Sequence, residues 1–500
     1  MHLLLRFSLT IWLICLPFMA TAADRVALVI GMAQYQHINT LKNTVNDANR
    51  IADTLESIGF DVTRAIDTPL DKLIQVIDDF SFRAETSELA LVYYAGHGVE
   101  VQGRNFLVPV DADVTSNLDV QRQSVSLKQL LAAVDSARKL RIVILDSCRD
   151  NPFGDRIDLG KQTAEVAENT TGTRGAGRGG LAPPSPDRGT LVAYAAKDGQ
   201  VALDGAGKNS PYATALAQKM KQPGLEISLM FRQVRDQVLE ATLNHQEPHT
   251  YGSLSGVPFY LAGPKKGESA LQVDDPLNAW SKLRPDQEQQ LAALAENGDT
   301  RSMVGLAYMR LNPAAERYDP SSAVKLLTRA SDAGSPEAQF ELAKLYEQGV
   351  GVEQDSARAL ELYKASAAQD YADAINDLGF MYYQGALGLP QDKQTALTYF
   401  ERAADLRHPQ AMFNFAALID DGLVPGKGPK DAAEYLYQAL RSGSSDVLNL
   451  LTERPAMFKD ATRKALQEKL REYSFYDGSI DGDFGPGTKR GIRAAFGLND

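Results

Sequence analysis

The chain has 500 residues and a formal net charge of −12 at pH 7. This length exceeds what one hydrophobic core can organise, so we expect about three domains. The acidic balance argues against general nucleic-acid binding. After an apolar stretch near the N-terminus no second long apolar run follows, so we expect no membrane span in the mature chain.

Residues 1–23 have the pattern of a secretory signal peptide. Arg6 is the positive flank, residues 9–18 are the apolar stretch, and Ala20 and Ala22 frame a small-residue cleavage site. The apolar stretch is too short to cross a membrane. We therefore predict that the mature chain starts near residue 24 and is exported.

Residues 24–262 alternate predicted strands and helices. Apolar runs indicate buried strands at 24–31, 60–63, 89–94, 106–110, 142–145, 189–194 and 257–261. Helical periodicity indicates helices at 48–58, 70–80, 126–139, 210–220 and 228–243. This alternation predicts an α/β layer fold with a mostly parallel sheet.

Two of these strands are followed by residues that can carry nucleophilic chemistry. His97 follows the strand 89–94, and Cys148 follows the strand 142–145. Open α/β sheets place their ligands at the carboxyl ends of the strands, so two neighbouring parallel strands would bring these residues side by side. An imidazole beside a thiol raises the thiolate fraction, and the thiolate is the reactive nucleophile.

The number of cysteines sharpens this prediction. The chain has two cysteines, and Cys15 lies in the predicted signal peptide. The mature chain would then hold Cys148 alone, with no partner for an internal disulfide. In an oxidising compartment a lone thiol is a liability unless it is used. The alternative is a buried, inert thiol.

Residues 155–189 interrupt the α/β pattern. They are rich in glycine and proline and hold almost no large apolar side chains, so they cannot bury enough surface to order themselves. Three arginines lie in this predicted flexible linker, namely Arg174, Arg178 and Arg188.

The region 24–262 resembles the caspase-like cysteine peptidases, and more closely the metacaspase and bacterial caspase-like branch. The resemblance rests on Tyr94-Ala-Gly-His-Gly98 and on Asp146-Ser-Cys148, with Cys148 51 residues after His97. It implies a three-layer sandwich and an acyl-enzyme mechanism, in which Cys148 is the nucleophile and His97 is first the base and then the acid. The backbone N–H groups of Gly98 and Cys148 would form the oxyanion hole.

The resemblance also implies an acidic specificity pocket. By their positions in metacaspase-type segments, the substrate-binding residues would be Asp47, Asp146 and Asp204. Carboxylates pair best with arginine or lysine, so we predict cleavage after basic residues and not after aspartate. One departure is Ala95, where metacaspases usually have serine. The alternatives are a helix-start acid for Asp47 and a cap of the following turn for Asp146.

An acidic pocket gives the linker 155–189 a second interpretation. Arg174, Arg178 and Arg188 would suit self-cleavage by a peptidase of basic specificity, whereas the alternative is a tolerated surface loop.

Metacaspases are often calcium-dependent, but the sequence shows no EF-hand pattern. We therefore assign no cofactor and no metal ligand, and calcium activation stays open.

Residues 287–450 predict helices only, after a linker at 263–286. Small residues open the first helix of each repeat at intervals of 36, 36 and 37 residues, and these are Ser302, Ala338, Ala374 and Ala411. Those that open the second helices are Ala323, Ala359, Ala396 and Ala432. The pattern resembles Sel-type tetratricopeptide-like repeats, which implies an α-solenoid of helix pairs that binds a protein partner. We expect Tyr346, Tyr363, Tyr382 and Tyr399 to pack between repeats rather than form a binding stripe.

Residues 455–500 predict a third unit. Asp477-Gly478 and Asp481-Gly482 indicate tight turns before Phe484-Gly-Pro-Gly-Thr488, between two predicted helices. This pattern resembles the small three-helix peptidoglycan-binding domain. The unit would bind peptidoglycan, or else serve only as a fold or as a protein dock.

These features together predict an exported cysteine endopeptidase, periplasmic or associated with the cell wall after secretion across the inner membrane. Its substrate would be a protein or peptide. The second hypothesis is a catalytically weak or inactive caspase-fold scaffold that acts through its helical repeats and its wall-binding module. A third, cleavage of the stem peptides of peptidoglycan, rests on the C-terminal unit alone.

Overall fold

The computed structural model describes residues 25–148, 189–197, 202–205, 207–252, 258–263, 277, 280, 283 and 285–498. The predicted signal peptide and nearly all of the predicted flexible linker, with Arg174, Arg178 and Arg188, lie outside the described residues. No helix of the described ranges is long and apolar enough to cross a membrane.

The N-terminal domain is built on one sheet. Its strands follow the order β2 (Asp61–Ile66), β1 (Arg25–Gly31), β3 (Leu89–Val101), β6 (Leu140–Cys148), β7 (Thr190–Tyr194) and β8 (His249–Gly252). The first five are parallel, and β8 is antiparallel to β7. A short antiparallel extension, β4 (Arg104–Leu107) and β5 (Val125–Ser126), continues from the end of β3.

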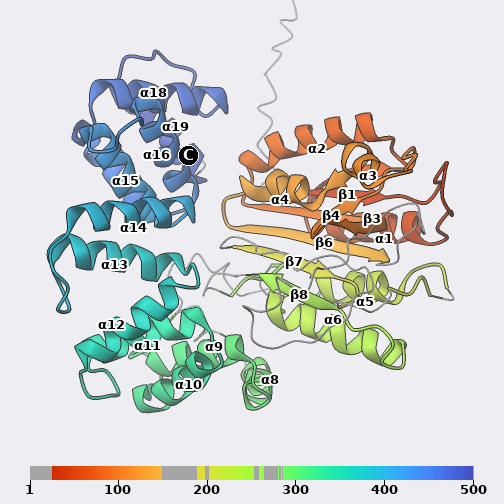
Figure 1. Ribbon diagram of the computed structural model, residues 1–500, viewed down its shortest axis with the longest axis horizontal. Helices are drawn as coiled ribbons and strands as arrows, with labels where there is room; N and C mark the ends of the chain where they lie inside the picture. The colour runs from red at the N-terminus through yellow and green to blue at the C-terminus, as the bar shows by residue number, and fades with distance from the viewer. Residues whose placement is uncertain are drawn as a thin grey trace, which may run out of the picture.

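Helices cover both faces of this sheet (Figure 1). Alternate residues of the central strands, such as Val29, Tyr93 and Ile144, pack toward α1 (Thr44–Ser57), α5 (Pro211–Met220) and α6 (Ile227–Ala241). The intervening residues pack toward the other face, which is covered by α2 (Leu70–Glu85), α3 (Asn117–Gln123) and α4 (Leu127–Asp135). Because the central strands are apolar on both faces, both sides must be covered. The predicted three-layer α/β sandwich is confirmed.

The closing strand of the sheet differs from the prediction. The segment 257–261 was expected to be the last strand, but its described part contributes only an isolated bridge between Tyr260 and Glu226. The strand that pairs with β7 is β8, with the sequence His-Thr-Tyr-Gly. This segment has no apolar run, and most of its residues are exposed at the sheet edge, so hydrophobic patterning could not reveal it.

Helix pairs follow the sandwich. The helices of the array are α8 (Pro285–Glu296), α9 (Thr300–Leu311), α10 (Pro320–Asp332), α11 (Pro336–Gln348), α12 (Ser356–Ala367), α13 (Ala372–Gln384), α14 (Lys393–Asp405), α15 (Pro409–Asp421), α16 (Pro429–Arg441) and α17 (Ser445–Glu453). The small residues that set the predicted repeat are all buried at helix contacts. Gly349, Gly385 and Gly422 end successive first helices in the left-handed conformation, which glycine adopts without strain. The α-solenoid is confirmed.

The four tyrosines of the repeats pack against the hydrophobic core of the array, as expected for packing between repeats. Tyr363 is fully buried, and Tyr346, Tyr382 and Tyr399 pack partly buried against the core. The rings of Tyr382 and Tyr399 stack with centroids 5.5 Å apart.

The C-terminal unit has a short 3₁₀ helix, η3 (Pro455–Met457), and two α-helices, α18 (Asp460–Glu472) and α19 (Pro486–Phe496). Its second Asp-Gly turn, Asp481-Gly482, is held by Gln467, which is fully buried. The Gln467 side chain accepts a hydrogen bond from Gly482 N–H at 2.8 Å and donates to the carbonyl of Asp483 at 3.0 Å. The turn motif therefore has a structural role in this unit.

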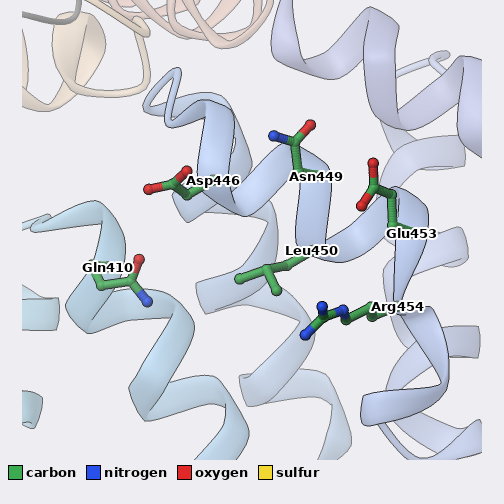
Figure 2. Close-up of a pocket in the computed structure, with 6 residues that line it drawn as sticks. All are labelled: Gln410, Asp446, Asn449, Leu450, Glu453 and Arg454. Carbon is green, nitrogen blue, oxygen red and sulfur yellow. The ribbon is translucent and has the colours of Figure 1, made fainter.

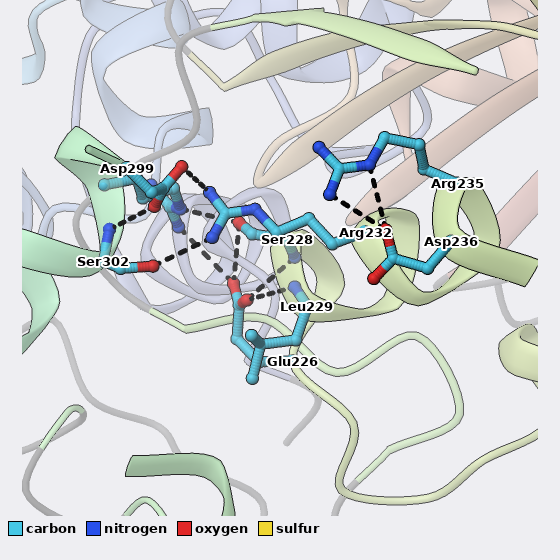
Figure 3. A network of polar contacts seen from close by, with 9 residues as sticks. Glu226, Ser228, Leu229, Arg232, Arg235, Asp236, Asp299 and Ser302 are labelled. Carbon is cyan, nitrogen blue, oxygen red and sulfur yellow. Dashed lines mark hydrogen bonds and ion pairs between the residues drawn. The ribbon is translucent and has the colours of Figure 1, made fainter. Parts of the chain in front are cut away.

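The first repeat is anchored to the sandwich by a polar network (Figure 3). The fully buried carboxylate of Glu226 caps α6 by accepting from Ser228 N–H and Leu229 N–H at 2.8 and 3.1 Å. Arg301 of α9 lies 3.5 Å from the same carboxylate, and Arg232 of α6 pairs with Asp299. A buried charge needs a partner of opposite charge. Arg301 of the helical array therefore supplies a counter-charge for Glu226 of the N-terminal domain.

The far end of the array is anchored as well, at the edge where β3 and β6 begin. Arg441 of α16 is 5% exposed and donates to the carbonyls of Ser87 at 3.2 Å and Ala495 at 2.7 Å, as well as to that of Glu85. Arg407 forms an ion pair with Asp135 at the end of α4. These contacts join the sandwich, the repeats and the C-terminal unit.

We expect Arg441→Ala to lower the free energy of unfolding by about 3 kcal/mol, because three carbonyls, two of them in buried contacts, lose their donor. Urea unfolding followed by circular dichroism would measure this loss. Arg358→Ala is the matched control, since Arg358 makes only an exposed ion pair with Glu361, and such pairs contribute about 0.5 kcal/mol. Equal effects of the two substitutions would contradict the anchoring role of Arg441.

Candidate active site

The two predicted catalytic residues lie at equivalent positions of adjacent strands. In the parallel pairing of β3 with β6, His97 is the register partner of Cys148, and Ala95 is the partner of Asp146. Neighbouring strands are about 4.8 Å apart. The sheet therefore places the backbones of the predicted base and the predicted nucleophile side by side at its carboxyl edge.

The surroundings of His97 favour a neutral imidazole with a defined tautomer. The residue is 9% exposed, and its burial lowers the pKa of the ring. Its Nε2 lies 3.1 Å from the carbonyl oxygen of Asn39. Because a carbonyl only accepts, Nε2 carries the hydrogen in this contact and Nδ1 is left as the basic nitrogen.

Tyr35 holds the same segment from the loop after β1. Its hydroxyl accepts from the backbone N–H of His97 at 2.8 Å, and its ring lies 4.7 Å from the imidazole. The hydroxyls of Tyr35 and Tyr94 also occupy the space that a side chain at Gly96 would need, at 2.7 and 2.6 Å from a Cβ there. This close approach explains the glycine before His97.

The oxyanion-hole assignment to the backbone of Gly98 and Cys148 stays a prediction. Gly98 is the antiparallel register partner of Leu107 in β4, so it sits where β3 leaves the parallel sheet.

The three predicted pocket acids lie together. Asp47 from α1, Asp146 from β6 and Asp204 from the segment before α5 line one small pocket. Its other lining residues are Leu41, Thr44, Gly96, Ala202, Leu203 and Ser210. Gly96 adjoins His97, so the pocket opens beside the predicted catalytic edge.

Asp47 and Asp146 are both buried, and Ser210 donates a hydrogen bond to each of them. Tyr93 Oη–H and Ser210 Oγ–H donate to Asp146 Oδ2 at 2.8 and 3.0 Å. Asn209 Nδ2–H and Ser210 N–H donate to Asp47 Oδ1, each at 2.9 Å. Loss of hydration and repulsion from Asp204 raise the pKa of Asp47 to about 6, and loss of hydration and repulsion from Asp47 raise that of Asp146 to about 7.

These contacts bear on the alternative interpretations of the two acids. Asp47 does lie in the first turn of α1, yet its carboxylate faces the start of α5, so a helix-start position and a pocket position coincide. The hydrogen bonds of Asp146 come from β3 and from the start of α5.

Sequence reasoning missed Tyr35, Asn39, Tyr93, Asn209 and a second role of Ser210. The sequence did indicate Ser210 as the N-cap of a helix with Pro211 at its first position, which the structure confirms. The contacts of the others pass through a backbone carbonyl or through residues far apart in sequence, so no local pattern marks them.

In the described ranges no group of three or more His, Cys, Asp or Glu side chains could hold a metal ion. A larger, polar pocket lies beside α15 and α17, and it is lined by Gln410, Asp446, Asn449, Leu450, Glu453 and Arg454 (Figure 2). It contains no nucleophile and none of the predicted site residues.

The comparison with protein families matches this geometry. Residues 24–259, which hold β3, β6 and the acidic pocket, match the family model described as the caspase domain. This N-terminal part of the chain is therefore similar to the caspase domain. Three segments, 300–335, 336–371 and 372–408, match the Sel1 repeat, and residues 459–495 match a putative peptidoglycan binding domain.

The individual relatives share only parts of the chain. The mucosa-associated lymphoid tissue lymphoma translocation protein 1 of Homo sapiens is 31% identical over 150 residues, which are 29% of this chain and 18% of that protein. Chitin synthase regulatory factor 3 of Schizosaccharomyces pombe is 30% identical over 199 residues, 37% of this chain and 21% of that protein. The chain thus spans about a fifth of the length of these relatives.

Among solved structures, a Sel1 repeat protein from Oxalobacter formigenes is similar to part of this chain. The similar region covers 38% of this chain and 83% of the chain of that protein. Its TM-score is 0.31 and its sequence identity is 20%.

Proposed function

We propose that the protein is an exported cysteine endopeptidase of the caspase and metacaspase type that cleaves after arginine or lysine. One observation carries the proposal: three carboxylates converge in a pocket beside the edge where His97 and Cys148 are register partners. The described residues that line this pocket include three acids and no lysine or arginine, so the pocket suits a cationic side chain.

The chemistry would be acyl transfer through Cys148. His97 takes the proton of the Cys148 thiol as the sulfur attacks the carbonyl carbon of the scissile bond, and it gives this proton to the leaving amine as the C–N bond breaks and the thioester forms. His97 then takes a proton from water, which attacks the thioester and releases the acid product and the thiol. The Asn39 carbonyl would keep Nδ1 as the nitrogen that carries the proton.

The pocket could accept both parts of a basic side chain. Leu41 and Leu203 supply apolar contacts for the methylene stem, and Leu203 is 38% exposed beside the acids. A guanidinium or ammonium would sit against Asp47 and Asp146 and favour their charged forms.

The other domains would set location and partners. Export to the periplasm or the cell wall is inferred from residues 1–23, the Sel1 repeats would bind a protein partner, and the C-terminal unit would bind peptidoglycan. Self-cleavage at Arg174, Arg178 or Arg188 and calcium activation belong to the same proposal.

The test is hydrolysis of fluorogenic peptides that end in arginine, lysine or aspartate by the mature full-length protein, with and without calcium. Turnover of the arginine and lysine peptides supports the proposal. A preference for aspartate would refute the acidic pocket and leave the cysteine chemistry standing. No turnover of any peptide, with the linker intact on a gel, would favour the scaffold hypothesis.

We expect kcat/KM for the arginine peptide to rise between about pH 6 and pH 7. Two of the pocket acids, Asp47 and Asp146, have a raised pKa, so they are protonated below this window and charged above it. The pH profile of iodoacetamide alkylation of Cys148 is the control, because that reaction needs the dyad and not the pocket. Matching profiles for the two reactions would show that the pocket does not govern the rise.

A further inference from the structure

Ser210 is the residue at which the acidic pocket and helix α5 meet. It is 3% exposed and is the N-cap of α5. Its Oγ accepts from Ala213 N–H at 2.9 Å while the hydroxyl hydrogen is directed to Asp146 Oδ2 at 3.0 Å. Its backbone N–H donates to Asp47 Oδ1 at 2.9 Å. One residue therefore contacts both buried carboxylates.

These contacts place the two carboxylates at the positive end of a helix. The first N–H groups of α5 lack partners within the helix, and the helix dipole favours negative charge there. A hydrogen bond to a charged carboxylate also stabilises the charged form. Ser210 supplies both effects to acids that come from separate elements, α1 and β6.

The neighbours of Ser210 hold this arrangement in place. Asn209 links Asp47 to Arg50, whose Nη1–H donates to Asn209 Oδ1 at 3.1 Å. Asn43 of the α1 N-terminus donates to the carbonyls of Asp204 and Gly207 at 2.7 and 3.1 Å. These hydrogen bonds therefore attach residues 204–209, before α5, to the N-terminal part of α1.

We propose that Ser210 is a positioning residue of the specificity pocket, which joins the carboxylates of Asp47 and Asp146 into one receptor for a basic side chain of the substrate. This role rests on the proposed peptidase function. Ser210 does not touch the reacting atoms. It acts on substrate affinity through the orientation and the charge of the two acids.

Several titratable or charged groups surround this receptor and enter its pH dependence. They are Asp47 and Arg50 on α1, Tyr93 on β3, Asp146 on β6, Asp204 before α5 and Tyr212 on α5. The tyrosines are buried and neutral, since burial raises the pKa of both. Asp47 and Asp146 are therefore the groups of this receptor whose raised pKa values place their charge change near neutral pH.

Ser210→Gly separates this role from ordinary helix capping. Glycine is nearly as good an N-cap as serine, whereas alanine is not. The Gly variant keeps the backbone N–H toward Asp47 and loses only the hydroxyl toward Asp146. Ser126→Ala is the control, because Ser126 caps α4 through Gln129 N–H and contacts no pocket acid.

The experiment measures kcat, KM and the pH profile of full-length Ser210→Gly, Ser210→Ala and Ser126→Ala on the arginine peptide. In both Ser210 variants we expect KM to rise about ten-fold, from loss of a hydrogen bond to a charged group, with kcat within about two-fold. The acid limb of kcat/KM should move to higher pH, because the lost donor had stabilised the charged carboxylate. Ser126→Ala should lower only the melting temperature.

Two results would overturn the proposal and tell its parts apart. If the wild type cleaves the arginine peptide but Ser210→Gly keeps its KM and its pH profile, the positioning role is wrong and the peptidase function stands. If the wild type cleaves no basic peptide, the proposed function fails and the role of Ser210 fails with it.

Discussion

Cys148→Ala is expected to abolish hydrolysis of the arginine peptide, with kcat/KM reduced on the order of 10⁴-fold or more, as for the loss of a nucleophile in other hydrolases. His97→Ala should cause a loss of similar size, because the two residues act as one unit and their effects do not add. The register of β3 and β6, which pairs the two residues, is the structural reason. Initial rates on purified full-length variants measure both effects.

His245→Ala is a control for the loss of a histidine as such. Its ring contacts only carbonyls at the end of α6, at 2.9 and 3.1 Å, so its activity should stay within about two-fold of wild type. Melting temperatures would show that all three variants are folded. Hydrolysis that persists in Cys148→Ala would show that Cys148 is not the nucleophile and would refute the dyad.

The main features of the fold follow from two patterns in the sequence, the apolar runs of the strands and the regular spacing of small residues in the repeats. The apolar runs before His97 and Cys148 are buried on both faces, so strand assignment and strand direction were enough to place the two residues at one edge. The solenoid was predictable for a similar reason. A repeat of small residues at 36 or 37 positions leaves few packing solutions.

The pocket acids were predicted by family resemblance and not by spacing. Asp47, Asp146 and Asp204 come from α1, β6 and the segment before α5, and no periodicity connects them. The structure brings them together, and it adds the groups that no pattern shows, such as the Asn39 carbonyl at His97. A backbone atom can be supplied by any residue type, so its role leaves no mark on the sequence.

The attachment of the array to the sandwich was also beyond sequence reasoning. Arg441 and Ser87 are 354 positions apart, and an arginine near the end of a helix usually indicates a solvated C-terminus. Phe82 stacks on Tyr473 with ring centroids 5.9 Å apart although it is still 59% exposed. Such contacts depend on the curvature of the whole array, which the helix pattern alone does not determine.

Asp146→Asn is expected to reduce kcat/KM for the arginine peptide about 100-fold, by removing a buried charge that faces the substrate cation. Asparagine keeps the shape and can still accept from Tyr93 and Ser210, so the loss reports charge rather than packing. Asp47→Asn should cause a comparable loss. Asp204→Asn should cause a smaller one, since Asp204 is only half-buried at the pocket and exposed charges are screened by solvent.

A second peptide decides whether the effect of Asp146 is specific. With a neutral glutamine in place of the arginine, Asp146→Asn should change kcat/KM by less than about three-fold, because no ion pair is lost. Its arginine-peptide profile should also lose much of the rise between about pH 6 and pH 7, since one of the two carboxylates that titrate there is gone. A uniform loss on both peptides would mean that Asp146 supports the fold of the catalytic edge and does not select the substrate.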